Sequence, residues 1–131
     1  MKAIILAAGK GTNLSPFSNT RPQPMIGVAG RTILDNSLEL LKSSGINDIF
    51  VVVGHKREKL IQALQDRDYD GLNIHHVEQK KSRGIGNAVM QVKNKISPGE
   101  YFLLLYGDII IADNIFSKIQ QSFHAFKSPV A

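Results

Sequence analysis

Short apolar runs alternate with amphipathic segments along the whole chain. Continuous apolar runs rich in β-branched residues are typical of buried strands, whereas apolar residues three and four positions apart indicate a helix with one buried face. Four strands are predicted on this basis, at Lys2–Ala7, Asp48–Val53, residues 72–77 and residues 101–106. Four helices are predicted to alternate with them, one from Ile33 to a stop at Gly45, and the others at residues 55–66, 86–95 and 114–126.

Alternating strands and helices, with strands that are apolar throughout, predict an α/β fold. In such a fold a mainly parallel sheet is covered by helices on both faces, giving a Rossmann-like three-layer αβα arrangement. The apolar stripe of the last helix is expected to belong to the core, including Phe123 and Phe126. Ligands of open parallel sheets bind outside the carboxyl ends of the strands. The segments that follow the strands are therefore the candidate site, at residues 8–24, 54–56, 78–87 and 107–108.

The composition is that of one ordinary domain, so residues 1–131 are treated as a single unit. The chain has 131 residues, of which 43% are hydrophobic, and it contains no cysteine, which excludes disulfides and thiolate metal sites. Its longest apolar stretch, residues 101–112, is interrupted by Gly107 and Asp108 and is shorter than the roughly 20 residues that a membrane-spanning helix needs. A cytoplasmic location is the expectation that follows.

The chain carries a formal net charge of +5, but its cations are mostly interspersed with acids. Lys80-Lys81-Ser82-Arg83 is the one basic cluster, and it lacks the interleaved aromatic residues on which nucleic-acid bases stack. Neither a nucleic acid nor a membrane is therefore expected as a partner. The cluster itself has two interpretations, a solvated loop or a loop that faces phosphate, and the sequence leaves both open.

A glycine-rich segment follows the first predicted strand, at residues 6–14. Its small residues let a ligand approach the backbone, and successive N–H groups of such a turn form a nest for phosphate oxygens. The spacing is not that of a P-loop, because no Gly-Lys-Ser/Thr closes it. It is not a dinucleotide fingerprint either, because Leu14 stands where the third glycine belongs. The glycines alone fit a tight turn as well as a phosphate-binding loop.

The wider segment decides between these interpretations. Leu-Ala-Ala-Gly-x-Gly-Thr-x-Leu-x-Pro, beginning at Leu6, is followed by Arg21-Pro22-x-Pro24-Met25. This order resembles the signature of the sugar-1-phosphate nucleotidyltransferases, which join a nucleoside triphosphate to a sugar 1-phosphate and release pyrophosphate. The resemblance implies that the chain is the N-terminal, nucleotide-binding part of such a domain. The implied nucleotide-binding residues of this loop are Leu6, Ala7, Ala8, Gly9, Gly11 and Thr12.

Two further segments are similar to the same family. Val77-Glu78-Gln79, with Gly84 five residues after the glutamine, resembles the base-reading loop. The resemblance implies that Gln79 reads the nucleobase edge and that Gly84 and Ile85 lie against the base and ribose. Leu105-Tyr106-Gly107-Asp108 resembles the metal-binding strand end, which places Tyr106 beside the nucleotide and Asp108 on Mg²⁺, a cation that prefers oxygen ligands. The family favours UTP or dTTP as the nucleoside triphosphate and a sugar 1-phosphate as the second substrate.

The sequence departs from the family at positions that carry its chemistry. Asn13 stands where the family has an arginine that stabilises the triphosphate, and Gln23 stands where it has a lysine that holds the α-phosphate. Ile85 replaces a threonine near the base or ribose. Since phosphoryl-type transfer depends on positioning and on stabilising developing charge, losing both cations predicts a very slow enzyme. Three cations near strand ends are candidate substitutes, although the sequence does not place their side chains: Lys10, Arg21 and Lys56.

Three kinds of function therefore stay open. The first is a nucleotidyltransferase that uses Mg²⁺, and the second is a degenerate or truncated module that binds nucleotides or regulates with little catalysis. The third is an assembly role, because residues 101–106 can present an open apolar strand edge that invites a homo-oligomer or a partner subunit. In the family the domain continues further, with the sugar pocket and a second metal-binding aspartate. The histidines receive no catalytic role, since adjacent His75 and His76 must point to opposite faces of a strand.

Overall fold

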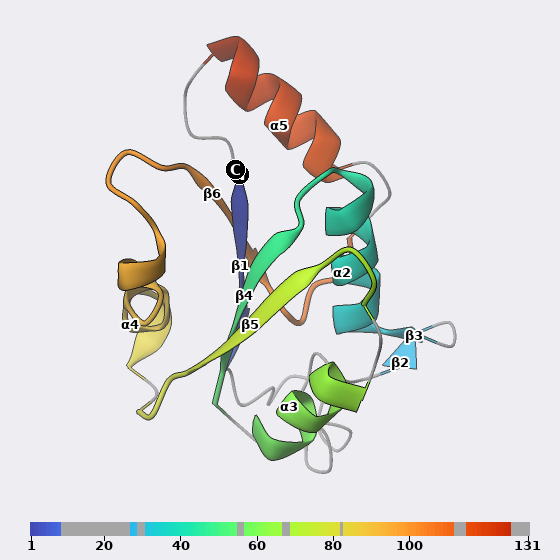
Figure 1. Ribbon diagram of the computed structural model, residues 1–131, viewed down its shortest axis with the longest axis vertical. Helices are drawn as coiled ribbons and strands as arrows, with labels where there is room; N and C mark the ends of the chain where they lie inside the picture. Colours follow the sequence, from blue (N-terminus) through green and yellow to red (C-terminus); the bar gives the residue numbers. More distant parts are fainter. Residues whose placement is uncertain are drawn as a thin grey trace.

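The computed structural model describes residues 1–8, 27–28, 31–54, 57–66, 69–81, 83–111 and 115–126 (Figure 1). Its centre is a four-stranded sheet in the order β5-β4-β1-β6, with every neighbouring pair parallel. The predicted α/β fold with a parallel sheet is therefore confirmed. The strands are β1 (Lys2–Ala7), β4 (Asp48–Val53), β5 (Asn73–Glu78) and β6 (Phe102–Tyr106).

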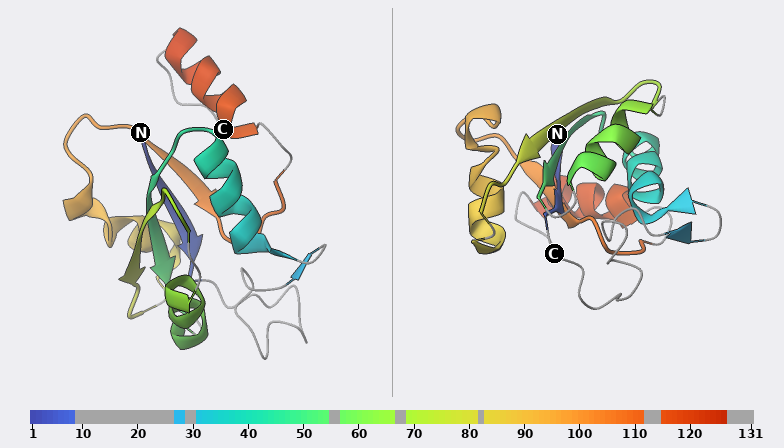
Figure 2. Two further views of the ribbon diagram at one scale, coloured as in Figure 1. Left: turned by 45° about the vertical axis from the view of Figure 1, so that its right-hand side comes forward. Right: turned by 90° about the horizontal axis from the view of Figure 1, so that it is seen from below.

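Helices cover both faces of this sheet, as the alternating pattern predicts. They are α2 (Ile33–Ser43), α3 (Arg57–Asp66), α4 (Gly84–Met90) and α5 (Ile115–Phe126), with a short 3₁₀ turn, η3, at Lys93–Lys95. Figure 2 shows α4 on the opposite side of the sheet from α2 and α3. Among the described helices, none has the length and apolar character needed to cross a bilayer.

The core has two layers because alternate residues of each strand point to opposite faces. Ile5 and its same-face neighbours pack against α2, α3 and α5, whose contacts include Leu38, Leu60 and Phe116. Ile4 lies on the other face, in a smaller cluster with Val52 and with Val92, which follows α4. The central strands β1 and β4 are buried on both sides, which explains why they read as continuous apolar runs.

The start of α2 is held by a capping box that sequence reasoning missed. Thr32 accepts a hydrogen bond from the Asp35 backbone N–H (3.0 Å), and the Asp35 carboxylate accepts one from the Thr32 backbone N–H (3.1 Å). Thr32 also ends a short antiparallel pair of strands, β2 (Gly27–Val28) and β3 (Arg31–Thr32), that the pattern did not predict. Two-residue strands are too short to show an alternating pattern, so the sequence carried no periodic signal for them.

Two predictions about the helices are wrong in detail. The helix predicted at residues 86–95 begins at Gly84 and ends at Met90, after which Gln91 and Val92 donate to carbonyls three residues back. Val92 is β-branched and a weak helix former, and it leaves the helix to enter the core. Phe126 is not core but 78% exposed, because the last turn of α5 lies beyond the sheet (Figure 1), while Phe123 is only partly buried.

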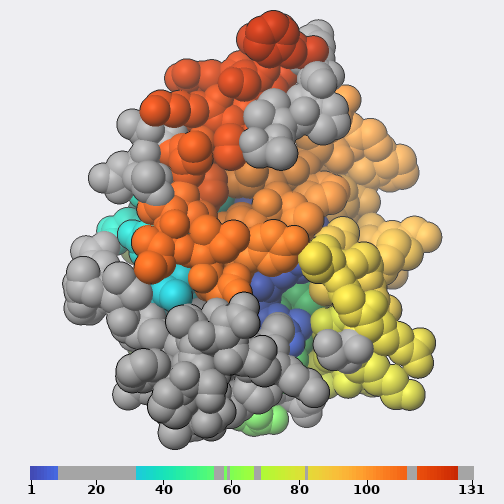
Figure 3. Space-filling model, turned by 180° about the vertical axis from the view of Figure 1, so that it is seen from behind, coloured from blue at the N-terminus to red at the C-terminus, as the bar shows by residue number. Residues whose placement is uncertain are grey.

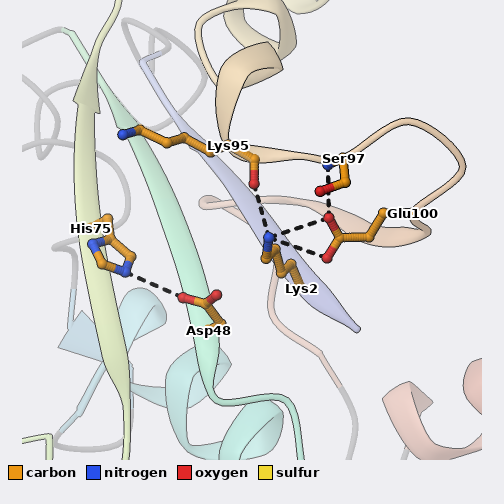
Figure 4. Close-up of polar contacts among 6 residues, drawn as sticks. All are labelled: Lys2, Asp48, His75, Lys95, Ser97 and Glu100. Carbon is orange, nitrogen blue, oxygen red and sulfur yellow. Dashed lines mark hydrogen bonds and ion pairs between the residues drawn. The ribbon is translucent and has the colours of Figure 1, made fainter.

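A polar network ties the amino ends of β1 and β6 together (Figure 4). Lys2 Nζ donates to the Lys95 carbonyl at 2.9 Å and forms an ion pair with Glu100 at 3.2 Å. The Glu100 carboxylate also accepts the Ser97 backbone N–H at 2.8 Å. This backbone hydrogen bond, and then the one from Lys2, lower the pKa of Glu100 below its ordinary value of 4.5. The network connects the first strand to the turn before the last strand.

Replacing Glu100 with glutamine is therefore expected to lower the thermal midpoint at pH 7. A carboxyl whose pKa is depressed by folding stabilises the protein above its unfolded pKa, and that stabilisation is lost as the pH falls through the folded pKa. The gap between wild type and Glu100→Gln should thus narrow as the pH falls below about 4.5. Thermal unfolding from pH 7 to pH 3 measures it, with Asp70→Asn as the charge-matched control. A gap that stays constant across this range would contradict the assignment.

Candidate functional site

The four parallel strands end at one edge of the sheet, and the segments predicted to bind a ligand leave from that edge. Ala8 follows β1, Gly54 follows β4, Gln79 follows β5 and Gly107 follows β6. We call this side the carboxyl edge. Since neighbouring strands lie about 4.8 Å apart, the ends of β5 and β6, three strands apart, are separated by about 14 Å. The edge is therefore wide enough to contact different parts of an extended ligand at different strands.

The chain reverses its order of strands between β1 and β6. From β1 it runs outward through β4 to β5, and it then returns to place β6 on the other side of β1. Leu6 pairs with Tyr106, and the Gly107 backbone N–H donates to the Leu6 carbonyl at 2.9 Å. Such a reversal is the topological switch point at which open α/β sheets bind their ligands. The exposed Asp108 thus comes directly after the residue that joins β6 to the end of β1.

Ala8 and Gly54 pack closely where β1 and β4 end. A Cβ atom at Gly54 would lie 3.1 Å from the Ala8 Cβ and 3.2 Å from the Ala8 carbonyl oxygen. The absence of a side chain at Gly54 therefore lets the segments that follow β1 and β4 approach each other closely. Leu6 and Ala7 lie inside β1, with Leu6 partly buried under the α4 face and Ala7 buried among the α2 and α3 contacts.

Gln79 is a buried polar residue at the end of β5, only 7% exposed. Its backbone N–H donates to the Val53 carbonyl at 2.8 Å, which extends the contact between β5 and β4. Its side-chain nitrogen, Nε2, donates to the Gly84 carbonyl at 3.3 Å and to Asn87 Oδ1 at 2.9 Å. These hydrogen bonds hold the predicted base-reading side chain against the start of α4. Sequence reasoning did not single out Asn87, although its place three residues after Gly84, on the same side of a helix, is a signal.

The residues around Gln79 are open to solvent. Gly84 begins α4 with a φ of +86°, a conformation that favours glycine, and Ile85 is 49% exposed. The cations before the helix are also exposed: Lys80, Lys81 and Arg83. Both Gly84 and Ile85 are therefore accessible from solvent beside Gln79. The basic cluster follows Gln79 directly, which agrees with either of its two interpretations.

Asp108 is a suitable metal ligand at this edge. Mg²⁺ is commonly held by one or two carboxylates, several waters and the phosphates of a substrate. A single exposed carboxylate at the end of β6 fits that use. Over the part of the chain that the structure describes, no three His, Cys, Asp or Glu side chains gather into a metal cluster. The Asp108 carboxylate and the phosphate oxygens of a ligand are oxygen donors of the kind that Mg²⁺ prefers.

The predicted residues of the first loop lie outside the described residues. These are Gly9, Gly11, Thr12, Asn13 and Gln23, and the same holds for Lys10, Arg21, His55 and Lys56. The predicted residues that the structure describes all lie on β1, at the carboxyl edge or at the start of α4. Tyr106 ends β6 and is 43% exposed, two residues before Asp108.

Comparison with protein families identifies the family of this chain. The model of the family described as nucleotidyl transferase matches residues 2–130. The chain belongs to the nucleotidyl transferase family. A family match over nearly the whole chain agrees with the resemblance carried by the three segments at the carboxyl edge, and it extends that resemblance to the strands and helices between them.

Two relatives are similar over most of this chain. The bifunctional protein GlmU of Methanococcus maripaludis is 41% identical over 115 residues, which cover 88% of this chain and 26% of that protein. The UTP–glucose-1-phosphate uridylyltransferase AglF of Haloferax volcanii is 37% identical, covering 88% of this chain and 46% of that protein. The chain thus spans between a quarter and a half of the length of these relatives.

A solved structure confirms the fold of this nucleotidyl transferase segment. A UTP-bound UGPase from Acinetobacter baumannii superposes with a TM-score of 0.79 at 20% identity, covering 97% of this chain and 53% of that chain. The described sheet and helices therefore correspond to about half of the solved chain. The fold is truncated relative to that structure, as the sequence predicts.

A pocket of about 270 Å³ lies away from this edge. It is lined by residues from the start of β6 and from α5, among them Tyr101, Phe102 and Phe123. The amino end of β6 lies at the other end of that strand from Gly107 and Asp108. We therefore assign the candidate nucleotide site to the carboxyl edge and not to this pocket.

Proposed function

We propose that this chain binds a nucleoside triphosphate with Mg²⁺ at the carboxyl edge, as the nucleotide-binding part of an NDP-sugar-forming nucleotidyltransferase. The observation that carries the proposal is the switch point between β1 and β6. There the Gly107–Leu6 hydrogen bond of 2.9 Å joins the ends of β1 and β6, and Asp108 is the next residue after Gly107. Gln79 lies at the end of β5, two strands from β1 on the other side.

In this proposal different strands contact different parts of the nucleotide. The base would lie against Gln79, Gly84 and Ile85, and the phosphates would lie at the end of β1. Asp108 would hold Mg²⁺, whose role is to neutralise charge on the phosphate oxygens. The relatives support UTP as the favoured nucleotide, because AglF is a UTP–glucose-1-phosphate uridylyltransferase and the UGPase structure is UTP-bound. A cytoplasmic location is part of the same proposal.

The reaction proposed for the whole protein is attack by a sugar 1-phosphate oxygen on the α-phosphorus. The new bond joins the two phosphates, and the bond to the β-phosphate oxygen breaks as pyrophosphate leaves. Asn13 and Gln23 offer no positive charge to this step, so the chain's own contribution to transition-state stabilisation is expected to be small. Nucleotide binding is therefore the first expected property, and a binding or regulatory module with little catalysis is the alternative.

Two measurements test these alternatives. Thermal-shift titration of the wild-type chain with UTP, dTTP, CTP, GTP and ATP in Mg²⁺ should show stabilisation by a uridine or thymidine nucleotide, because a ligand of the folded state raises its stability. Flat curves for every nucleotide would contradict the binding proposal. Pyrophosphate release from UTP or dTTP with glucose 1-phosphate, at high protein concentration, tests catalysis. Binding without any turnover would support the nucleotide-binding module and contradict the enzymatic function for this chain.

The exposed side of β6 supports a further part of the proposal, association with a second copy of the chain. In the described sheet β6 pairs with β1 and stands at the edge. Alternate residues of the strand are buried in the core, while Phe102, Leu104 and Tyr106 are 38%, 41% and 43% exposed. Figure 3 shows β6 and the segment after it at the surface between α5 and α4. An exposed apolar edge strand is a template for pairing with another chain.

Light scattering of the wild-type chain should therefore give a dimer at high concentration. Leu104→Asp is expected to produce a monomer, because it places a charge in the centre of the proposed contact. Met90→Asp makes the same kind of change at another exposed apolar residue, on α4, and should leave the dimer intact. A wild-type chain that stays monomeric at high concentration would contradict the association.

A further inference from the structure

Asn87 contacts the predicted base-reading residue from the side of α4. Its Oδ1 accepts a hydrogen bond from Gln79 Nε2 at 2.9 Å, and the same nitrogen donates to the Gly84 carbonyl at 3.3 Å. Asn87 is half-buried, and Gln79 is 7% exposed. The contact is therefore largely removed from water, where a hydrogen bond restricts a side chain more strongly than at the surface.

The Gly84 carbonyl identifies which end of the Gln79 amide points toward α4. A carbonyl oxygen can only accept, so the amide atom that contacts it must be the nitrogen. The two hydrogens of Nε2 are then used by Gly84 and Asn87. The carbonyl oxygen, Oε1, is the remaining group of the side chain that can bind a ligand, and it can only accept. Gln79 in this orientation offers a base an acceptor and no donor.

We infer that Asn87 is a positioning residue that sets the hydrogen-bonding polarity of Gln79 and thereby selects the base. The inference rests on the proposed nucleotide site. An acceptor suits a base whose ring carries an N–H at the contacted edge, as N3–H of uracil or thymine does. Cytosine placed in the same way presents the N3 lone pair, which repels Oε1. Without Asn87 only the longer contact with the Gly84 carbonyl, at 3.3 Å, opposes an amide that turns over to offer Nε2 to cytosine, so the selection should weaken.

Affinities for UTP and CTP, measured by calorimetry in Mg²⁺, test this in four proteins. The wild type should prefer UTP by about tenfold or more, the cost of leaving a buried polar group mismatched. Asn87→Ala should reduce that ratio several-fold. Asn87→Asp keeps an acceptor at Oδ1 and should show the wild-type ratio of UTP to CTP affinity. Its added charge can weaken the binding of both nucleotides equally without changing that ratio. Gln91→Ala is the matched control, because its exposed side chain contacts the backbone of Asn87 at 3.1 Å and does not reach Gln79.

The outcomes separate this inference from the proposed function. A ratio that falls in Asn87→Ala and recovers in Asn87→Asp supports the positioning role. Equal loss of UTP and CTP affinity in Asn87→Ala, with the ratio kept, would overturn it in favour of a purely structural contact, while the nucleotide site would stand. A wild type that binds neither nucleotide would overturn the proposed function and, with it, the selection of a base. The Gln79 side-chain amide resonances give a ligand-free measurement, because they should shift in Asn87→Ala and stay in place in Gln91→Ala.

Discussion

The paired change Asn13→Arg and Gln23→Lys should tighten UTP binding by about tenfold or more. A hydrogen bond to a charged group contributes roughly 1.5–3 kcal/mol, so even one well-placed cation gives about a tenfold gain. Asn13 and Gln23 are the positions at which this sequence lacks the cations of the family it resembles. Calorimetric titration with UTP and Mg²⁺ measures the gain, which should shrink at high salt because ionic contacts are screened.

The matched control adds the same two charges far from the carboxyl edge. Asn94→Lys and Gln121→Arg change exposed residues of η3 and α5, so they raise the net charge without placing a cation near the proposed phosphates. Their UTP affinity should stay close to that of the wild type. If the paired Asn13 and Gln23 variant binds UTP no more tightly than this control, the first loop does not contact the triphosphate. If it also releases pyrophosphate faster with a sugar 1-phosphate, the missing cations explain the slow chemistry expected of the wild type.

Asp108→Asn is expected to remove the dependence of UTP binding on Mg²⁺. In the wild type, chelating the metal should weaken binding by about tenfold or more, because the metal then no longer offsets the phosphate charge. The variant keeps the size of the side chain and loses the carboxylate, so its affinities with Mg²⁺ and with chelator should be nearly equal. The structure makes this test specific, because Asp108 follows the residue whose N–H is bonded to the end of β1.

Asp70→Asn serves as the control for the metal prediction. It removes an equal charge from an exposed turn before β5, at the other end of that strand from Gln79. This variant should keep the full difference between Mg²⁺ and chelator. An Asp108→Asn protein that retains the wild-type difference would show that the metal is held elsewhere, and the site would have to be redrawn.

The sequence predicted the strands well because buried parallel strands leave a strong signal. β1 and β4 read as continuous apolar runs, since both of their faces are covered, and their predicted bounds match the structure. The order of the strands carries no such signal, and neither does the Gly107–Leu6 hydrogen bond that joins β6 to β1. The topology came from the structure, although the rule that ligands bind at strand ends had already indicated the relevant segments.

The apolar periodicity was a less reliable guide to where a helix ends and which of its residues are buried, because packing decides both. The stripe on α5 is amphipathic from end to end, but its last residue, Phe126, extends beyond the sheet and has nothing in the described chain to cover it. In α4 the pattern continues past Met90, while the chain tightens into a turn that brings Val92 into the core. The contact between Gln79 and Asn87 was not predicted either. The spacing of Gly84 and Asn87 puts them on one side of a helix, but the contact itself depends on how the end of β5 meets α4.

The most direct test of the proposed nucleotide site is an NMR titration of the wild-type chain with UTP and Mg²⁺. Backbone resonances of the carboxyl edge should shift, namely those of Ala8, Gly54, Gln79, Gly107 and Asp108. Resonances of the amino-edge network, Lys2, Ser97 and Glu100, should stay in place at the same UTP concentration. Shifts confined to the amino edge, or no shifts at millimolar UTP, would contradict the assignment of the nucleotide to this edge of the sheet.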